Sequence, residues 1–232
     1  MKVQNKATRS GRSQWLVPVG IVLVILGIAG IGAYQAYYNP KPPKILETYG
    51  NQSVDSVDAE GKPFTYTIVH RVPDFEFTDQ NGDKVSQKTT EGKTYVADFF
   101  FTSCPTICPK MTSQLKRLQS LTKEEGIVIL SHSVDPIRDS VARLKKYAID
   151  NGLDTKNWHL MTGDAEDIYD LGMEGYNLSA MEDGSAPGGF LHSEMVVLVD
   201  KEGHLRGMYE GTNTEAMDRL VADIKKLKTE YE

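Results

Sequence analysis

Two nearly continuous apolar segments, at 94–101 and 127–134, constrain the fold of this chain most strongly. Segments of this length and composition are typical of strands that are buried on both faces of a sheet. Apolar residues then repeat at helical spacing over 111–121 and 141–147, after each segment. Because strands that alternate with helices pack as a sheet between helical layers, we predict an α/β fold with a central mixed sheet flanked by helices.

Weaker patterns around these segments complete the predicted sheet. The Asn81-Gly82 pair between strand-like flanks predicts a hairpin over 75–85. A glycine-rich stretch at 175–189 predicts a long loop. Further strands are predicted at 66–69, 158–161, 195–200 and 205–209, and further helices at 165–171 and 217–227.

The first part of the chain contains a run without any charge from Trp15 to Ala33. A helix rises about 1.5 Å per residue, so this run covers roughly the hydrocarbon core of a bilayer. We therefore predict one transmembrane helix over 15–38, which ends in tyrosines typical of a membrane interface. A cleaved signal peptide is the alternative, but the run is longer than a usual signal core and no Ala-x-Ala site ends it.

The residues on the two sides of this run indicate its orientation. Residues 1–14 carry four basic and no acidic side chains, so the positive-inside rule leaves this tail in the cytoplasm. A proline-rich segment opens a linker at 39–63, and 64–232 is predicted to form one folded domain. Since the tail is too short for a convincing transit peptide, we expect a bacterial inner-membrane protein rather than a mitochondrial one. It is single-pass, with the C-terminal domain in the periplasm or outside.

The charge of the exported part excludes one class of partner. The chain has a formal net charge of -6, and removing the four basic residues of the tail leaves about -10. Nucleic acids repel such a surface, so we expect no nucleic-acid partner. An acidic surface also aids solubility, which is an equally good explanation of the charge.

Cys104 and Cys108 are the only cysteines of the chain, and they stand where the first buried strand leads into a helix. Residues four apart at a helix start project from one face, so the two sulfurs can meet or share one ligand. The free amides and the positive end of the helix dipole favour thiolate there, which both metal binding and redox chemistry require. A permanent disulfide is the alternative, but it would close only a tiny loop.

A third ligand is sought among the five histidines, because two thiolates alone hold a soft cation only as a linear pair. His192 is the best candidate, since it follows the glycine-rich loop and directly precedes a predicted strand. His132 is the one alternative, and His70, His159 and His204 have structural explanations. Thiolates with an imidazole suit copper in either oxidation state, whereas a structural zinc site normally has four protein ligands.

Three motifs, in this order, resemble the SCO/SenC family: Cys-Pro-x-x-Cys-Pro after an aromatic strand, Ser133-Val-Asp-Pro-Ile-Arg-Asp, and Leu-His-Ser before the last strands. The resemblance covers roughly 64–232. It implies a membrane-anchored, thioredoxin-like copper chaperone for cytochrome c oxidase assembly. It also implies that Cys104, Cys108 and His192 hold Cu(I) or Cu(II) and pass it to the dinuclear copper site of oxidase subunit II, or to another exported copper protein.

One position departs from the family pattern, and one other function fits the motif. The family commonly has Asp after the first Cys-Pro, where this chain has Thr106, so the resemblance does not carry over that carboxylate's role. The alternative function is a thiol-disulfide oxidoreductase that reduces the cysteines of an exported partner. Thioredoxin-type enzymes place two residues between their cysteines, whereas this chain has three. We therefore expect a metallochaperone rather than an enzyme, with a thiol reductase as a partner because the dithiol must be reduced to take copper.

Overall fold

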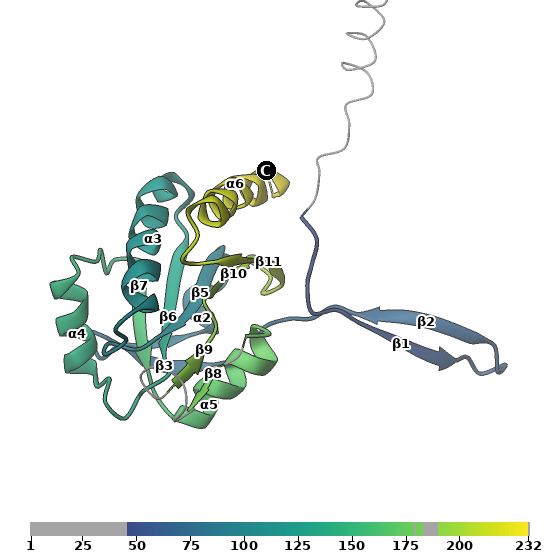
Figure 1. Ribbon diagram of the computed structural model, residues 1–232. Helices are drawn as coiled ribbons and strands as arrows, with labels where there is room; N and C mark the ends of the chain where they lie inside the picture. The colour runs from purple at the N-terminus through teal and green to yellow at the C-terminus, as the bar shows by residue number, and fades with distance from the viewer. Residues whose placement is uncertain (1–45, 179, 183–189, 232) are drawn as a thin grey trace, which may run out of the picture. The chain divides into compact units, whose positions relative to one another are not determined.

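The computed structural model describes residues 46–178, 180–182 and 190–231 (Figure 1). The strands of the main sheet are β3 (Glu76–Asp79), β4 (Lys84–Ser86), β5 (Tyr95–Phe100), β6 (Val128–Ser133), β7 (Trp158–Thr162), β10 (Met195–Val199) and β11 (Leu205–Glu210). They follow the order β11-β10-β5-β6-β7-β3-β4. The central strands β5, β6 and β7 are parallel, and the outer strands pair antiparallel on both sides. The predicted mixed sheet is confirmed.

Helices cover both faces of this sheet. They are α2 (Gln87–Thr90), α3 (Ile107–Leu121), the 3-10 turn η1 (Lys123–Glu125), α4 (Val141–Asp150), α5 (Ala165–Asp170), the π-helical turn η2 (Leu171–Gly175) and α6 (Thr214–Glu230). Side-chain hydrogen bonds join α3 to its two neighbours, Thr112 to Tyr147 of α4 at 2.9 Å and Gln114 to Thr214 of α6 at 2.8 Å. Thus α4, α3 and α6 lie side by side along one face, while α5 lies on the other side (Figure 1).

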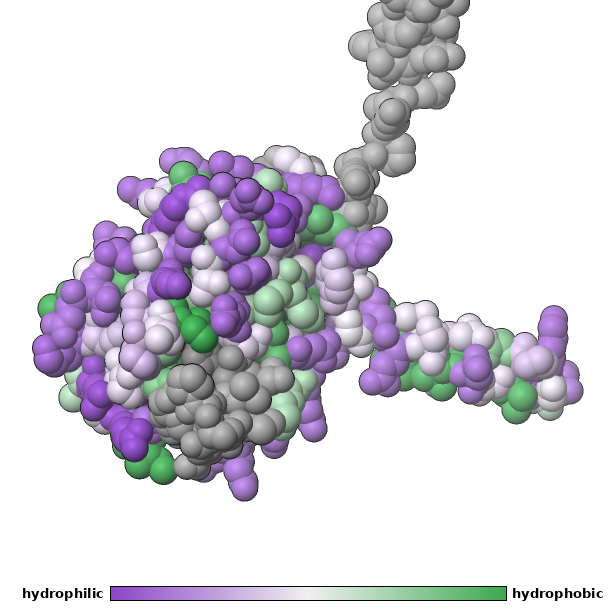
Figure 2. All heavy atoms as spheres, viewed as in Figure 1, coloured by the Kyte–Doolittle hydropathy of each residue, from purple (hydrophilic) through white to green (hydrophobic). Residues whose placement is uncertain are grey.

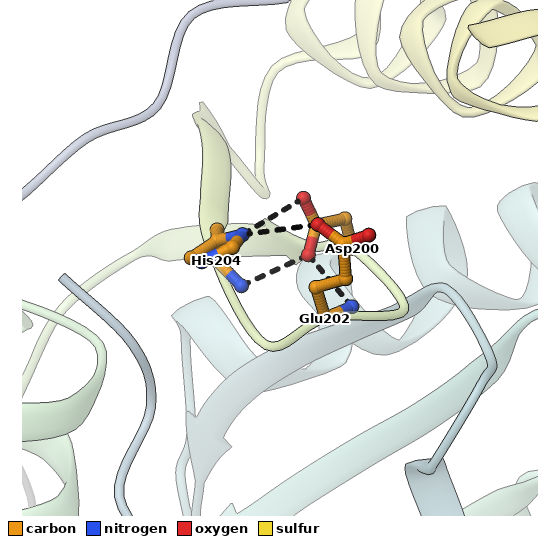
Figure 3. Close-up of side chains that lie close together, drawn as sticks. All are labelled: Asp200, Glu202 and His204. Carbon is orange, nitrogen blue, oxygen red and sulfur yellow. Dashed lines mark hydrogen bonds and ion pairs between the residues drawn. The ribbon is translucent and has the colours of Figure 1, made fainter. Parts of the chain in front are cut away.

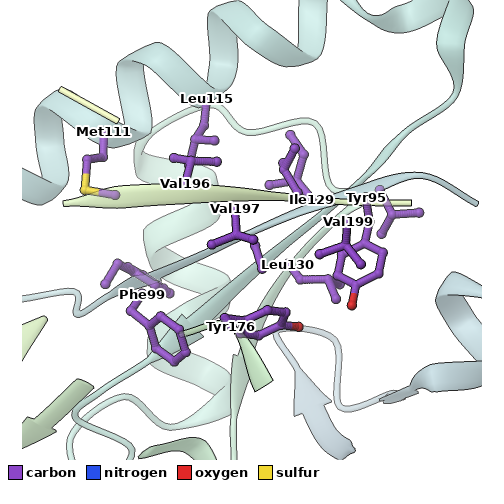
Figure 4. Close-up of a cluster of buried hydrophobic side chains, with 14 of the residues drawn as sticks. Tyr95, Phe99, Met111, Leu115, Ile129, Leu130, Tyr176, Val196, Val197 and Val199 are labelled. Atoms are coloured by element: carbon purple, nitrogen blue, oxygen red, sulfur yellow. The ribbon is translucent and has the colours of Figure 1, made fainter. Parts of the chain in front are cut away.

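The core lies on both sides of the central strands. Every residue of β5 and β6 is buried, as the continuous apolar segments predict. In Figure 4, Met111 and Leu115 of α3 lie on one side of the sheet, and Phe99 and Tyr176 lie on the other. Since both faces are covered, these strands need apolar side chains at odd and even positions alike.

The register of the parallel strands decides which side chains share a face. Asp98 lies opposite Ser131, and Phe99 lies opposite His132. Successive side chains of a strand point to opposite faces, so Asp98 faces the α3 and α4 side while its neighbour Phe99 faces the other. The carboxyl ends of β5 and β6 meet at one edge of the sheet, and the segment with the two cysteines begins at that edge.

Two small hairpins correct the sequence-based assignment. Strand β1 (Gln52–Val57) pairs antiparallel with β2 (Pro63–Ile68) in a separate sheet, although β1 falls in the range predicted as a linker. Strand β8 (Ala180–Glu182) lies where a loop is predicted, and it pairs with β9 (Phe190–His192), which follows that range directly. Short, partly polar strands carry little pattern of their own, because their partners rather than their composition specify them.

The transmembrane prediction at 15–38 concerns residues outside the described part of the chain, and so does the basic tail at 1–14. Among residues 46–178, 180–182 and 190–231, no helix has the length and the apolar character needed to cross a bilayer. The described residues belong to one compact unit, which begins at Ile45.

Candidate functional site

The two cysteines meet at the start of α3. Cys104 lies in the turn between β5 and α3, and Cys108 lies in the first turn of the helix. The backbone N–H of Cys108 donates a hydrogen bond to the Sγ atom of Cys104, with 3.4 Å between nitrogen and sulfur. Cys104 is 9% exposed and Cys108 is 1% exposed. The structure contains both as thiols rather than as a disulfide. The two cysteines thus lie together at the helix start, although Cys104 precedes the N-cap Thr106 and does not share a face of the helix.

The environment of Cys104 favours its thiolate form. Burial by itself raises the pKa of this thiol, but backbone N–H groups of Cys108, Thr106 and Ile107 and the Cys108 side chain direct hydrogen bonds at the sulfur. These bonds outweigh burial, so the pKa of Cys104 lies below its ordinary value. Cys104 is thus the thiol that is ready to bind a cation or to attack a disulfide.

The environment of Cys108 has the opposite effect. Burial, the hydrogen bond with Cys104 and the nearby negative charges of Cys104 and Asp98 all raise the pKa of Cys108. In the metal-free site, Cys104 is therefore the more readily ionised of the two thiols. Binding of a cation to both sulfurs displaces the proton of Cys108, because only the thiolate is a good ligand.

A buried carboxylate fixes the turn that precedes Cys104. Asp139 is fully buried and accepts hydrogen bonds from the N–H of Thr102 at 2.9 Å, from the Thr102 hydroxyl at 2.5 Å and from the Ser133 hydroxyl at 2.6 Å. Arg143 completes the group, since its Nε donates to Thr102 Oγ1 at 2.6 Å. The ends of β5 and β6 and the start of α4 are thereby joined two residues before Cys104.

A second buried carboxyl lies beneath the cysteines. Asp98 accepts a hydrogen bond from the Ser131 hydroxyl at 2.5 Å, and Trp158 Nε1 donates to the same hydroxyl at 2.9 Å. Burial raises the pKa of Asp98 to about 7, although the bond from Ser131 acts in the other direction. Asp98 is close enough to Cys108 for its charge to affect that thiol.

His132 lies away from the two sulfurs. Its ring stacks on Phe99 at 5.1 Å between centroids and is also enclosed by Phe75, Phe77 and Tyr176. Neither ring nitrogen has a hydrogen-bond partner among the described residues, and burial lowers the pKa of His132 to about 3. Because Phe99 and Asp98 point to opposite faces, His132 lies across the sheet from the cysteine side.

The other histidines divide into those with structural partners and His192. His70 Nε2 lies 2.8 Å from the carbonyl of Gly175, and His159 Nδ1 lies 2.9 Å from a carboxylate oxygen of Asp79. His192 is the last residue of β9, where its Cα pairs with that of Ala180. Its side chain lies outside the described part of the chain, so its role as a ligand stays a prediction.

His204 belongs to a separate group of possible ligand atoms in the turn between β10 and β11. In this turn, one carboxylate oxygen of Asp200, one of Glu202 and a ring nitrogen of His204 lie close together (Figure 3). Asp200 already accepts hydrogen bonds from the backbone N–H groups of Glu202 and His204 and from Arg206. Although burial opposes it, these bonds hold the pKa of Asp200 below its usual range. The group therefore has a structural explanation as the closure of a tight turn.

Sequence reasoning identified the two cysteines but not the groups that tune them. Asp98 stands within an apolar strand pattern, and only the register with Ser131 shows that it faces the site. Asp139 is the last residue of the Ser133-to-Asp139 motif, so the motif contained it without indicating its function. The isolated acid within an otherwise apolar strand was the one feature that could have pointed to Asp98.

A mixed sheet with a dithiol at the start of the helix after a central parallel strand defines a thioredoxin-like protein. The chain matches the SCO1/SenC family model over residues 66–229 and belongs to this family. It is 31% identical over 183 residues to the SCO1 protein homolog of Bacillus subtilis, which covers 78% of this chain and 89% of the relative.

Solved structures agree with this family. BsSco, described as a member of the Sco family of cytochrome c oxidase assembly proteins with a disulfide switch, is 32% identical with a TM-score of 0.62; the match covers 70% of this chain and 95% of that one. ScoI of Bradyrhizobium japonicum, solved with copper bound, is 26% identical with a TM-score of 0.54 and 68% and 99% coverage. Relatives of this chain thus include a copper-bound protein and one described as having a disulfide switch.

Proposed function

We propose that this chain is a membrane-anchored copper chaperone whose ligands are the thiolates of Cys104 and Cys108 and the imidazole of His192. The observation that carries the proposal is the geometry at the start of α3, where the N–H of Cys108 lies 3.4 Å from the sulfur of Cys104 and the pKa of Cys104 is lowered. Two sulfurs so close together can both reach one ion. The donor set is soft and suits Cu(I), and an added imidazole suits Cu(II) as well.

The cargo and its destination follow from the family. Relatives are linked to cytochrome c oxidase assembly, and one holds copper. We therefore propose delivery of copper to the dinuclear copper site of oxidase subunit II. The uncharged run from Trp15 to Ala33 and the basic tail before it support a single-pass anchor in a bacterial inner membrane. Residues 64–232 then lie on the side of this membrane opposite to the cytoplasm.

Release of copper has a simple physical basis in this site. The pKa of Cys108 is raised by burial and by the nearby charges, so a proton competes with the metal at this sulfur more strongly than at Cys104. Transfer to a partner that offers its own ligands can then begin with reprotonation of Cys108. Cys104 keeps hold of the ion until the partner's ligands replace it.

The test is an anaerobic Cu(I) titration of the reduced full chain in detergent against a competing chelator. We expect one tight site per chain, complete loss of it in Cys104→Ser with Cys108→Ser, and a Kd raised at least about ten-fold in His192→Ala, which corresponds to about 1.4 kcal/mol. His204→Ala is the matched histidine control and leaves the Kd unchanged. Equal binding by the cysteine variant would refute the copper site, and equal weakening by both histidine variants would refute the role of His192.

A thiol-disulfide oxidoreductase is the second candidate, and the opposite pKa shifts of the two thiols favour it. In this reaction the Cys104 thiolate attacks a partner disulfide, which releases one partner thiolate and forms a mixed disulfide. Cys108 then loses its proton and attacks the sulfur of Cys104, so the second partner thiol leaves and a Cys104 to Cys108 disulfide remains. The partner gains two electrons, and a thiol reductase must restore the dithiol.

This candidate predicts that Cys108→Ser traps a mixed disulfide with an exported partner, because the resolving thiol is absent. Cys104→Ser is the matched control and traps much less, since Cys108 is mostly protonated. Non-reducing electrophoresis of both variants measures the difference. Equal trapping, or none in either variant, would contradict the oxidoreductase reading and leave copper binding untouched.

A further inference from the structure

The hairpin of β1 and β2 presents large apolar side chains to solvent. Every residue of β2 is exposed, and Phe64, Tyr66 and Ile68 are 46%, 45% and 48% exposed. Figure 2 shows apolar residues gathered along one side of this hairpin. Contiguous exposed apolar surface of this kind is uncommon on soluble domains and usually marks an interaction site.

The apolar side chains share one face of the hairpin. Phe64, Tyr66 and Ile68 alternate along β2, and the rings of Phe64 and Tyr66 are 6.0 Å apart between centroids. The register places Val54 of β1 opposite Tyr66, which adds a fourth apolar residue to this face. We call Val54, Phe64, Tyr66 and Ile68 the apolar hairpin face.

The opposite face of the hairpin is mainly polar, and its one apolar pair is Val57 opposite Pro63 beside the turn. The register places Asp55 opposite Thr65, and the Thr65 hydroxyl donates a hydrogen bond to the Asp55 carboxylate at 2.7 Å. Ser53 lies opposite Thr67 on the same side. The hairpin is therefore amphipathic, because alternate residues of each strand point to opposite faces. Its charged residues lie on one face and in the turn that connects the strands.

The main sheet does not explain this hairpin. The family model begins at residue 66, so β1, the turn and half of β2 precede the part that this model matches. The hairpin forms a sheet of its own, and a two-stranded sheet alone is marginally stable in water. A second surface that covers the apolar hairpin face would stabilise it.

The position of the hairpin in the chain limits what that surface can be. Eighteen residues separate Ala33, the end of the uncharged run, from Gln52, the first residue of β1. Even at full extension, a chain of this length reaches only about 65 Å. If the run spans a bilayer, the hairpin is tethered within that distance of the membrane surface.

We propose that the apolar hairpin face lies in the interfacial region of the same membrane that the anchor spans. The proposal rests on the anchor of the proposed function. Aromatic rings such as those of Phe64 and Tyr66 favour the interface between acyl chains and headgroups, and this face has no charged residue to desolvate. Asp55 points to the polar side and stays in water. A docked hairpin would give the linker a second attachment and so limit the positions of the copper site above the membrane.

The test uses the full chain in phosphatidylcholine vesicles with a tryptophan reporter. Trp15 is replaced by Phe, and the remaining Trp158 is 1% exposed in the core. Phe64→Trp then reports on the apolar hairpin face, with Tyr66→Trp as a second reporter on it. Thr65→Trp, one residue away on the polar face, is the matched control. Emission is compared between ordinary vesicles and vesicles whose acyl chains are brominated near the headgroups.

We expect bromine to reduce the reporter emission roughly two-fold in Phe64→Trp and Tyr66→Trp and to leave Thr65→Trp almost unchanged, because the interface buries one face by about 5–10 Å. Equal quenching of the three variants, or of none, overturns the proposal. A blue-shifted but unquenched Phe64→Trp also overturns it, since another protein surface or a second copy then covers the face.

Flotation of the same vesicles and Cu(I) titration of the same samples separate this inference from the proposed function. Protein that floats and binds copper without quenching of Phe64→Trp refutes the docked hairpin alone. Protein that does not float after an alkaline wash refutes the anchor and, with it, this inference. Protein that floats and is quenched but binds no copper refutes the chaperone and supports the docked hairpin.

Discussion

Asp98 and His132 lie on neighbouring strands, β5 and β6, but point to opposite faces of the sheet. Both are fully buried, and burial shifts both toward the neutral form: the pKa of Asp98 rises to about 7 and the pKa of His132 falls to about 3. The surroundings differ. Asp98 bonds to Ser131 and lies near Cys108, whereas His132 is enclosed by aromatic rings.

This difference indicates a division of roles between the two faces. The face of Asp98 contains polar groups that adjoin the dithiol, including the network of Asp139 and Thr102. The face of His132 is sealed by Phe75, Phe77 and Phe99. Substitutions on the aromatic face are therefore expected to change stability alone, while substitutions on the cysteine face change stability and copper binding together.

The largest expected effect comes from Phe99→Ala. Phe99 is fully buried in the aromatic cluster, and truncation of such a side chain costs about 3–5 kcal/mol of unfolding free energy. Urea unfolding of the metal-free protein measures this loss. The Kd for Cu(I) should stay within about two-fold of the parent value, because substitutions at distant, independent sites affect each other little. A large rise in Kd would show that the two faces are not independent.

The pH dependence of Asp98→Asn comes next. A carboxyl with a raised folded-state pKa binds its proton more tightly in the folded state, so its contribution to stability is present below pH 3.8 and is lost as pH rises through about 7. Between pH 5 and pH 8 this loss amounts to about 3 kcal/mol. Asn keeps the acceptor for Ser131 and has no charge, so the variant should gain stability relative to the parent at pH 8. Parallel profiles for the two proteins would mean that Asp98 is not held neutral.

His132→Leu should show the opposite sign. A histidine whose folded-state pKa is lowered to about 3 binds fewer protons in the folded state, so stability falls as pH drops from about 6.5 toward 3. From pH 7 to pH 4.5 the parent should lose about 2.5 kcal/mol that the variant keeps. Urea midpoints at the two pH values test this, with His159→Leu as the control histidine. An equal loss in parent and His132→Leu would place the acid sensitivity elsewhere.

The smallest effect is expected from Thr102→Val. The change removes the hydroxyl that donates to Asp139 and accepts from Arg143, at a cost of about 1 kcal/mol in stability. Because the turn of Cys104 loses one of its attachments, the Kd for Cu(I) should also rise a few-fold. Ser140→Ala, which removes the cap of α4 at a similar cost of about 1 kcal/mol, is a control that should not change the Kd. Equal Kd values for both variants would mean that the attachment of the Cys104 turn through Thr102 does not affect copper binding.

Much of the fold could be predicted from local patterns. The Asn81-Gly82 turn forms as predicted, with Gly82 at a φ of 86° that glycine adopts at no steric cost. The continuous apolar segments became β5 and β6, and the helical spacing after each became α3 and α4. Each of these elements can be recognised from its own residues. A strand buried on two faces is apolar throughout, and a helix buried along one stripe has apolar residues at helical spacing.

The elements that sequence reasoning missed depend on partners far along the chain. β1 has the sequence Gln-Ser-Val-Asp-Ser-Val, whose alternation is weak, and only its pairing with β2 makes it a strand. The π-helical turn after α5 also lacks a local indication, since five ordinary residues continue the helix with a wider hydrogen-bond pattern.

The sequence by itself determined the cysteine pair, its place after a buried strand and the family of the protein, because each depends on residues that are close together in the chain. The lowered pKa of Cys104 comes from the amides at the start of its own helix, as the sequence predicts. Only the tertiary structure decided the raised pKa of Cys108 and the buried Asp98 beneath the pair, which depend on burial and on parallel register. Those properties arise when strands 33 residues apart are brought side by side, as Asp98 and Ser131 are, and no local pattern encodes them.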